Sequence, residues 1–427
     1  METKRIKAEM WDKMQYLFRN YYDRMVHAVL YYDGKIDVNI LKQVLVYMTE
    51  KAPVLHSEFV DNKVHPYWKI RDYKIDDILK YTKSENLEND INSFITEMIP
   101  ITNNVQYQVR LFDDGKKSVF CMLINHMCFD GGDTKYFLKK MAENYNKLLN
   151  KQYNLELKAG DRGYKQVYTK LESEDIKIAK GLYKNVSVVK DAHTFPVTEP
   201  SDGDISRILR EKIDRETFQK FKEKGKEWNV TINDSLLAVY IHTLYQIGDY
   251  PKDEKVSIPC MVDLRRHIKG GIDAGGLTNH TGFMVVSTKK RGYTLKETLI
   301  EVLRSVKDSK RDRFLGLYSL PLLSLAYIIF PHIISEVAIK IGYYNPLIGM
   351  SNIGIINTEE LKLGNNNLID GFMTGGIKYK PYMQLALTTL NDEITMTVAM
   401  RCNDNDEEII NNFFQRFKEN MNKFIAE

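Results

Sequence analysis

The chain has 427 residues, of which 43% are hydrophobic and 28% charged, and its formal net charge is +4. A chain of this length is expected to form two or three domains, and the composition is typical of a folded globular protein. The small net charge excludes a dedicated nucleic-acid binder, because such a protein would carry a strong basic patch. We therefore expect no nucleic-acid partner.

The N-terminus lacks the apolar segment that secretory signals carry, so a cytoplasmic location is the simplest expectation. One membrane-like stretch runs from Leu317 to Ile334, but Pro321, Pro331 and His332 interrupt it. We expect this stretch to form a buried or groove-lining helical segment and not a transmembrane span. A peripheral contact with a membrane surface is the alternative.

In the first part of the chain, apolar residues at helical spacing predict a helix from Val38 that Pro53 ends. This helix runs into a strand over residues 55–60. The runs 105–112 and 118–125 predict two strands of a β-hairpin, with a glycine in the turn between them.

After this hairpin, Asp133 is expected to cap a helix over residues 134–149. The segment from Val188 to Asp204 contains prolines and glycine without apolar periodicity, which predicts a boundary between two lobes. We place the N-terminal lobe at residues 1–190 and the C-terminal lobe at residues 205–427.

The second part of the chain alternates strands and helices in the same way. Strands are expected over 205–213, 255–260, 282–287, 383–390 and 394–401, and helices over 214–228, 235–247, 295–307 and 407–424. Because strands and helices interleave in both halves, we expect an α/β fold with mixed sheets.

The most informative segment follows the predicted strand 118–125 and reads NHMCFDGGD over residues 125–133. It places His126 at the end of an apolar strand and Asp130 four positions later. An imidazole there could take a proton from a hydroxyl, an amine or a thiol. Asp130 could orient the ring directly or hold the loop through an arginine elsewhere. A packed histidine and an aspartate that caps a turn would explain the same pattern equally well.

The residue types of this segment suggest two other chemistries. Asp130 and Asp133 beside His126 permit a metal site, but one histidine with carboxylates on one loop is a thin ligand set, and we expect no metal. Cys128 suggests a cysteine–histidine hydrolase, yet side chains two residues apart on a loop rarely meet. The four cysteines form no CxxC pair, which favours reduced thiols in or near the core.

The segment from His126 to Gly131 resembles the HxxxDG signature of the chloramphenicol acetyltransferase-like superfamily. This group includes condensation domains of nonribosomal peptide synthetases, BAHD acyltransferases and alcohol acetyltransferases. Four further stretches resemble the superfamily in the same order, at residues 53–59, 231–238, 262–265 and 351–354. The ordered set covers nearly the whole chain and is more specific than any one stretch.

The resemblance implies two similar lobes of mixed sheet flanked by helices, with a tunnel between them and His126 at its centre. His126 would deprotonate an alcohol or amine acceptor, a small molecule that attacks an acyl thioester. The thioester would be acyl-coenzyme A or the phosphopantetheine arm of an acyl carrier protein. Asp130 is implied to be structural and to pair with Arg265. No tightly bound cofactor is implied.

The same resemblance implies a donor for the oxyanion that forms during acyl transfer. The candidates are the backbone amides of Gly131 and Gly132, and Ser351 or Asn352 on a distant segment. The basic run 289–291 could meet the phosphates of coenzyme A or an acidic carrier, although such runs are more often solvated faces.

The sequence departs from the family pattern at Asn125, where peptide-forming condensation domains carry a second histidine. With no carrier or adenylation segment and no DFGWG-like stretch, this favours a free-standing enzyme that acylates alcohols or amines. Two alternatives stay open. One is a stand-alone condensation enzyme that forms an amide from carrier-bound substrates, and the other is an inactive binding or scaffold protein of the same fold.

Overall fold

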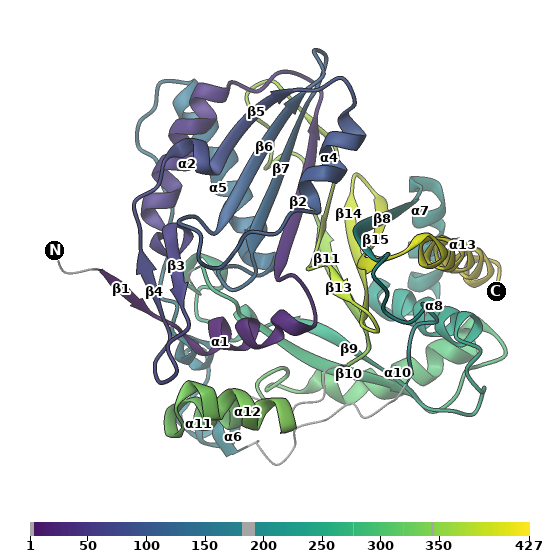
Figure 1. Cartoon of the computed structure of the whole chain (residues 1–427). Helices are drawn as coiled ribbons and strands as arrows, with labels where there is room; N and C mark the ends of the chain where they lie inside the picture. The colour runs from purple at the N-terminus through teal and green to yellow at the C-terminus, as the bar shows by residue number, and fades with distance from the viewer. Residues whose placement is uncertain (1–3, 182–192, 276, 319, 343–345) are drawn as a thin grey trace.

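The structure is a computed structural model, shown in Figure 1, that describes residues 4–181, 193–275, 277–318, 320–342 and 346–427. Of the predicted lobe boundary, residues 188–192 lie outside the described ranges. Strands and helices interleave along the whole chain and the larger sheets contain parallel and antiparallel pairs. The predicted α/β class with mixed sheets is therefore confirmed.

A five-stranded sheet forms the centre of the N-terminal part (Figure 1). Its order is β12 (Leu368–Thr374), β2 (Met25–Tyr32), β7 (Ser118–Asn125), β6 (Tyr107–Asp113) and β5 (Leu79–Lys83). Every residue of the apolar strand β7 is buried, because helices pack on both faces of the sheet. Helices α2 (Val38–Lys51) and α5 (Gly131–Leu149) share one core with it, and α4 (Leu87–Ile95) packs on the other face.

The outer strand β12 comes from far along the chain, and it pairs antiparallel with β2, with Phe372 opposite Val29. The two proposed lobes are therefore joined by backbone hydrogen bonds as well as by side-chain packing.

A seven-stranded sheet forms the centre of the C-terminal part. Its strands are β10 (Thr281–Thr288), β9 (Val256–Asp263), β11 (Ile348–Ile355), β14 (Met383–Leu390), β15 (Glu393–Cys402) and β13 (Lys378–Tyr379), with β8 (Ile205–Ile213) also paired to β15. Four amphipathic or apolar helices share its core: α7 (Arg215–Glu227), α8 (Ile232–Ile247), α10 (Leu295–Arg311) and α13 (Asp404–Ala426).

The remaining elements lie around these two sheets (Figure 1). A small sheet contains β1 (Arg5–Lys7), β4 (Tyr67–Ile70) and β3 (Ser57–Val60). The other α-helices are α1 (Met10–Leu17), α3 (Ile75–Ile78), α6 (Ser173–Gly181), α9 (Ile272–Gly275), α11 (Leu320–Ile329) and α12 (His332–Gly342). Short 3₁₀ segments span Phe18–Asn20, Pro53–His56, Tyr164–Tyr168 and Leu264–His267.

One expectation about helices was wrong, and a second was met only in part. Helix α5 begins at Gly131 and not at Thr134, and its N-cap is Asp130, whose side chain accepts from the amide of Asp133. The stretch from Leu317 to Ile334, expected to be a buried or groove-lining helical segment, is only partly buried. Leu317 and Leu320 lie in a core cluster, whereas α11 and α12 expose several large apolar side chains. Within the described ranges, no helix combines the length and the apolar character that crossing a membrane requires.

Candidate active site

The candidate site begins where β7 ends at Asn125. The buried Asn125 side chain donates to Gln106 Oε1 at 2.8 Å and accepts from the amide of Met127 at 3.0 Å. The Asn125 carbonyl accepts from the amide of Cys128 at 2.8 Å. Asn125 thus closes a tight turn between the strand and the loop that follows, and its side chain is committed to that turn.

The next residue, His126, is fixed by contacts on both its backbone and its ring. Its amide donates to the Arg24 carbonyl at 2.7 Å, and its ring Nδ1 lies 2.9 Å from Oδ1 of Asn279. The Asn279 amide nitrogen in turn donates to the His126 carbonyl, which requires Oδ1 to face the ring. Because Oδ1 can only accept, Nδ1 carries the proton and Nε2 presents its lone pair.

The ring of His126 is held in the neutral state. Burial lowers its pKa below the ordinary value, an effect that the Asp130 carboxylate and the bond to Asn279 only partly offset, and the Lys378 ammonium lowers it further. The residue is half-buried, and Nε2 has no hydrogen-bond partner among the described residues. At neutral pH this arrangement offers an unprotonated nitrogen that can accept a proton.

Asp130 contacts Arg265 and makes no hydrogen bond with the His126 ring. The two guanidinium nitrogens of Arg265 lie 3.0 Å from the two Asp130 oxygens, and one of them also lies 2.7 Å from Asp133. The Asp130 carboxylate further accepts from the amides of Asp133 at 2.9 Å and His280 at 2.8 Å. The ring is thus oriented by Asn279, whereas Asp130 ties the loop to the segment that holds Arg265.

The charges of this network are buried and mutually compensated. Burial alone would raise the pKa of Asp130, but the Arg265 guanidinium and the hydrogen bonds outweigh it and hold that pKa below its usual range. Burial and the adjacent Asp130 carboxylate raise the pKa of Asp133. As N-cap and N3 residue of α5, the two aspartates also lie at the positive end of the helix dipole.

A second arginine, which the sequence did not suggest, holds the same loop from another side. Arg162 donates to the carbonyls of Cys128 at 3.1 Å and Leu277 at 2.7 Å, and it pairs with the buried Asp12 at 2.5 Å. Leu277 lies two residues before Asn279. Arg162 therefore links the loop of His126 to the segment whose amide orients the ring.

Gly131 and Gly132 form the first turn of α5 (Gly131–Leu149), where backbone amides have no intrahelical acceptor. A Cβ at Gly132 would lie 2.9 Å from an Arg265 nitrogen, so the close approach of the arginine requires a glycine there. A Cβ at Gly131 would meet nothing within 4 Å. Both amides remain candidates for binding an oxyanion.

Ser351 and Asn352 lie on β11, whose bulge at Asn352 and Gly354 approaches the first turns of α5. Lys135 on α5 donates to the Ile353 carbonyl at 2.8 Å. The exposed Asn352 side chain accepts from the Gly354 amide at 3.0 Å and donates to Asn233 at 3.3 Å, so it serves its own bulge. The half-buried Ser351 makes no side-chain hydrogen bond within the described ranges.

A nucleophilic role of Cys128 finds little support in this geometry. The Cys128 side chain is completely buried and its sulfur faces the Val54 carbonyl at 3.9 Å. Burial raises the pKa of this thiol, which disfavours a nucleophilic thiolate. Among the described residues, no three histidine, cysteine or acidic side chains come together as a metal site.

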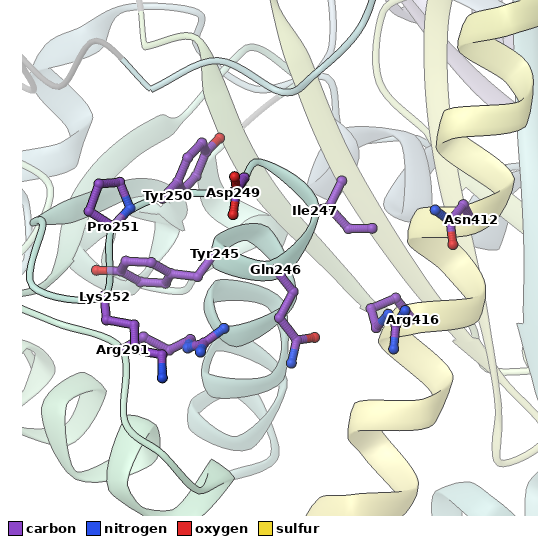
Figure 2. A pocket seen from close by; sticks show the side chains of 10 residues that line it. All are labelled: Tyr245, Gln246, Ile247, Asp249, Tyr250, Pro251, Lys252, Arg291, Asn412 and Arg416. Atoms are coloured by element: carbon purple, nitrogen blue, oxygen red, sulfur yellow. The ribbon is translucent and has the colours of Figure 1, made fainter.

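A separate hollow of about 660 Å³ lies at the C-terminal end of α8 (Figure 2). It is lined by Tyr245, Gln246, Ile247, Asp249, Tyr250, Pro251, Lys252, Arg291, Asn412 and Arg416. The amide of Arg291 donates to the Lys252 carbonyl at 2.8 Å, which brings two cationic residues together. The hollow contains the end of the basic run 289–291 but none of the residues around His126.

The comparisons with known proteins identify a family and a fold. The family model described as "Condensation domain" matches residues 12–312. No curated protein matches the sequence. Among solved structures, the first condensation domain of the CDA synthetase is 12% identical and superposes with a TM-score of 0.71, over 99% of this chain and 97% of that one.

Two further structures share the fold. The trichothecene 15-O-acetyltransferase TRI3 of Fusarium sporotrichioides is 12% identical, with a TM-score of 0.72 over 98% of this chain and 95% of its own. The epimerization domain from the third module of tyrocidine synthetase B is 12% identical, with a TM-score of 0.68 over 99% and 98%. Family and fold support an acyl-transfer or condensation function. Because the family model spans well over half of the sequence, the chain belongs to the condensation-domain family, with the chloramphenicol acetyltransferase-like fold.

Proposed function

We propose that the protein is an acyltransferase that moves an acyl group from a thioester to an alcohol or amine, with His126 as the general base. The observation that supports this most directly is the clamp of Asn279 on His126, which sets the Nδ1–H tautomer and leaves Nε2 as the acceptor. The lowered pKa of His126 keeps this nitrogen unprotonated at neutral pH. These are the properties that a base needs when its proton donor is a hydroxyl or an amine.

The proposed reaction begins with the removal of a proton from the acceptor. Nε2 of His126 takes the proton as the acceptor oxygen or nitrogen bonds to the thioester carbonyl carbon. The C–S bond then breaks, and the proton passes from the imidazolium to the departing thiolate. The oxyanion formed on the way needs a hydrogen-bond donor. The proposed donors are the first-turn amides of Gly131 and Gly132, which have no intrahelical acceptor, and the hydroxyl of Ser351. The Asn352 side chain instead accepts from the Gly354 amide of its own bulge.

The environment of Asn125 is compatible with this proposal. Its side chain is used by Gln106 and Met127 and lies in the interior. Replacing the first histidine of the peptide-forming pattern therefore leaves the His126 clamp intact. We infer that the acceptor is not restricted to the amine of a carrier-bound amino acid.

The test is turnover of the purified full chain with acyl-coenzyme A donors and alcohol or amine acceptors, followed by thiol release. His126→Ala should lower kcat/KM by about a hundredfold to ten-thousandfold while the thermal unfolding curve is retained. Cys128→Ala is the matched control, because a thiol nucleophile would be lost in it. Full activity in the first variant, or none in a folded second variant, would refute the base assignment.

The family model favours one alternative donor, a phosphopantetheine thioester on a carrier protein. The same assay separates the two donors when each acyl group is offered on coenzyme A and on a loaded carrier. Product from coenzyme A thioesters supports the free-standing acyltransferase, and product only from the carrier supports condensation. Absence of product from both, with a folded chain, would favour the scaffold protein.

A further inference from the structure

The helices α11 (Leu320–Ile329) and α12 (His332–Gly342) form a hairpin at the edge of the molecule, near α1 (Figure 1). We call this pair the apolar hairpin. Its sequence from 320 to 342 contains two charged residues, Glu336 and Lys340. Seven of its large apolar side chains are between 46% and 83% exposed: Leu325, Ile329, Phe330, Ile333, Ile334, Val337 and Ile341.

Helix α12 buries polar side chains and exposes apolar ones, which is the reverse of an ordinary surface helix. The side chains that it buries include the polar residues His332, 3% exposed, and Ser335, fully buried. The Ser335 hydroxyl donates inward to the Ala326 carbonyl at 3.0 Å. Ile334, Val337 and Ile341 recur at helical spacing on the opposite, exposed face. A helix that packs against its own protein usually buries its apolar face. The described residues of this chain leave this face uncovered, which indicates a partner beyond them.

The charges around the apolar hairpin indicate the chemistry of that partner. The carboxylate of Glu336 is turned away from solvent, 12% exposed and 2.7 Å from Arg19. The loop between β3 and β4 lies against the start of α12, since the Lys63 carbonyl accepts from Ile333 at 3.1 Å. Lys63 and its neighbour His65 are both exposed.

The same loop also contributes apolar surface and one acid. Val64 is 50% exposed, and its carbonyl accepts from the amide of His332 at 3.2 Å. Asp61 is engaged by the Tyr16 hydroxyl at 2.6 Å and lies 3.4 Å from the His332 ring. Among the described residues of this edge, Lys63 and His65 are exposed and make no side-chain hydrogen bond or ion pair. Glu336 is paired with Arg19, and Asp61 is 44% exposed and bound by Tyr16.

We propose that the apolar hairpin and the loop 63–65 bind an anionic lipid surface. The aliphatic side chains would enter the boundary between headgroups and acyl chains, with Lys63 and His65 at the phosphates. No helix among the described residues is long and apolar enough to cross a membrane, so the contact is one that lies on the surface. This proposal goes beyond acyl transfer and does not depend on the acceptor or donor.

The test is co-sedimentation of the full chain with vesicles of phosphatidylcholine alone and of equal parts phosphatidylcholine and phosphatidylglycerol. The wild type should bind the anionic vesicles more strongly. Val337→Glu and Ile341→Glu should each lower the partition coefficient about tenfold, since they place a carboxylate on the inserted face. Lys63→Glu should lower binding to the anionic vesicles about fivefold and leave binding to the neutral ones unchanged.

The matched control is Ile205→Glu on β8, because Ile205 is 55% exposed and Val337 is 53% exposed. Ile205→Glu should bind vesicles as the wild type does. Wild-type binding by Val337→Glu, or an equal loss in Ile205→Glu, would overturn the proposal. So would a wild-type dimer in light scattering that binds no vesicles and dissociates in Val337→Glu, because the face would then be a contact between two copies.

Discussion

The loop after β7 and the apolar hairpin (α11 and α12) both depart from the usual pattern of charged residues outside and apolar residues inside, but in opposite ways. The loop region buries charge, since Asp130, Asp133 and Arg265 are at most 5% exposed. The apolar hairpin exposes aliphatic surface instead, up to 83% of Ile341. Each arrangement is unfavourable by itself, because a buried charge loses its hydration and an exposed apolar group orders water.

The two regions differ in whether partners within the chain offset the unfavourable burial or exposure. Each buried charge of the loop region has partners within the chain, at 2.7–3.0 Å from Arg265. Among the residues that the structure describes, none covers the exposed face of α12. Buried charges with partners in the chain fix the geometry of the loop, here the position of His126. An exposed apolar face without such a partner indicates a partner outside the molecule. Both statements can be tested by breaking the compensation or by removing the exposed groups.

The largest expected effect is on the buried network. Arg265→Ala should lower the free energy of unfolding by about 3–5 kcal/mol, because Asp130 and Asp133 would stay buried without their cation. Denaturant unfolding of both proteins at pH 7 gives the difference. Arg265→Lys should lie between them, since a lysine keeps the charge and loses the two-pronged contact. A loss below about 1 kcal/mol in the alanine variant would mean that the network is not compensated by Arg265.

A smaller effect is expected from the two glycines beside this network. Gly132→Ala should cost about 1–3 kcal/mol, because its Cβ would lie 2.9 Å from an Arg265 nitrogen. Gly131→Ala is the matched control, since its Cβ meets nothing within 4 Å and alanine favours the helix. Thermal unfolding of the pair should therefore move in opposite directions. Equal shifts would show that the approach of Arg265 does not require a glycine.

The parts of the fold that the sequence predicted are those with a local signal. The strands predicted over 105–112 and 118–125 and the helix predicted from Val38 follow from apolar runs and periodicity. All three are present, as β6 (Tyr107–Asp113), β7 (Ser118–Asn125) and α2 (Val38–Lys51). The strands β2 and β12 were not predicted. β2 is buried throughout, so it shows no alternation, and the pairing of β12 with it crosses most of the chain.

The site was predictable to a similar extent. The positions of His126 and Asp130 followed from spacing, and Arg265 from a resemblance. Asn279 and Arg162 were missed, because Asn279 is separated from His126 by 153 residues and neither stands in a recognisable pattern. For the apolar stretch 317–334, the sequence predicted a buried or groove-lining helical segment, but composition alone could not tell which side chains are covered. Only the burial of His332 and Ser335 shows that the apolar face of α12 points outward.

The pH dependence of kcat/KM tests whether the loop region holds His126 as an unprotonated base. The base acts when unprotonated, and burial lowers the pKa of His126 below about 6.5. kcat/KM should therefore be flat above that pH and fall about tenfold per unit below the lowered pKa. The bond to Asn279 raises this pKa, so Asn279→Leu should lower the plateau and move the acid limb to lower pH. If the acid limb of the pH profile stayed in place in this variant, the group that titrates would not be the imidazole held by Asn279.

The smallest expected effect concerns the stability of the apolar hairpin. Ile341→Ser should change the free energy of unfolding by no more than about 0.5 kcal/mol, since the side chain is 83% exposed and contributes little to the core. Ile410→Ser on α13 (Asp404–Ala426), where the isoleucine is fully buried, is the control and should cost about 2–5 kcal/mol. If Ile341→Ser cost as much as the control, the isoleucine would pack within the chain. The face of α12 would then be compensated internally, and it would no longer indicate an outside partner.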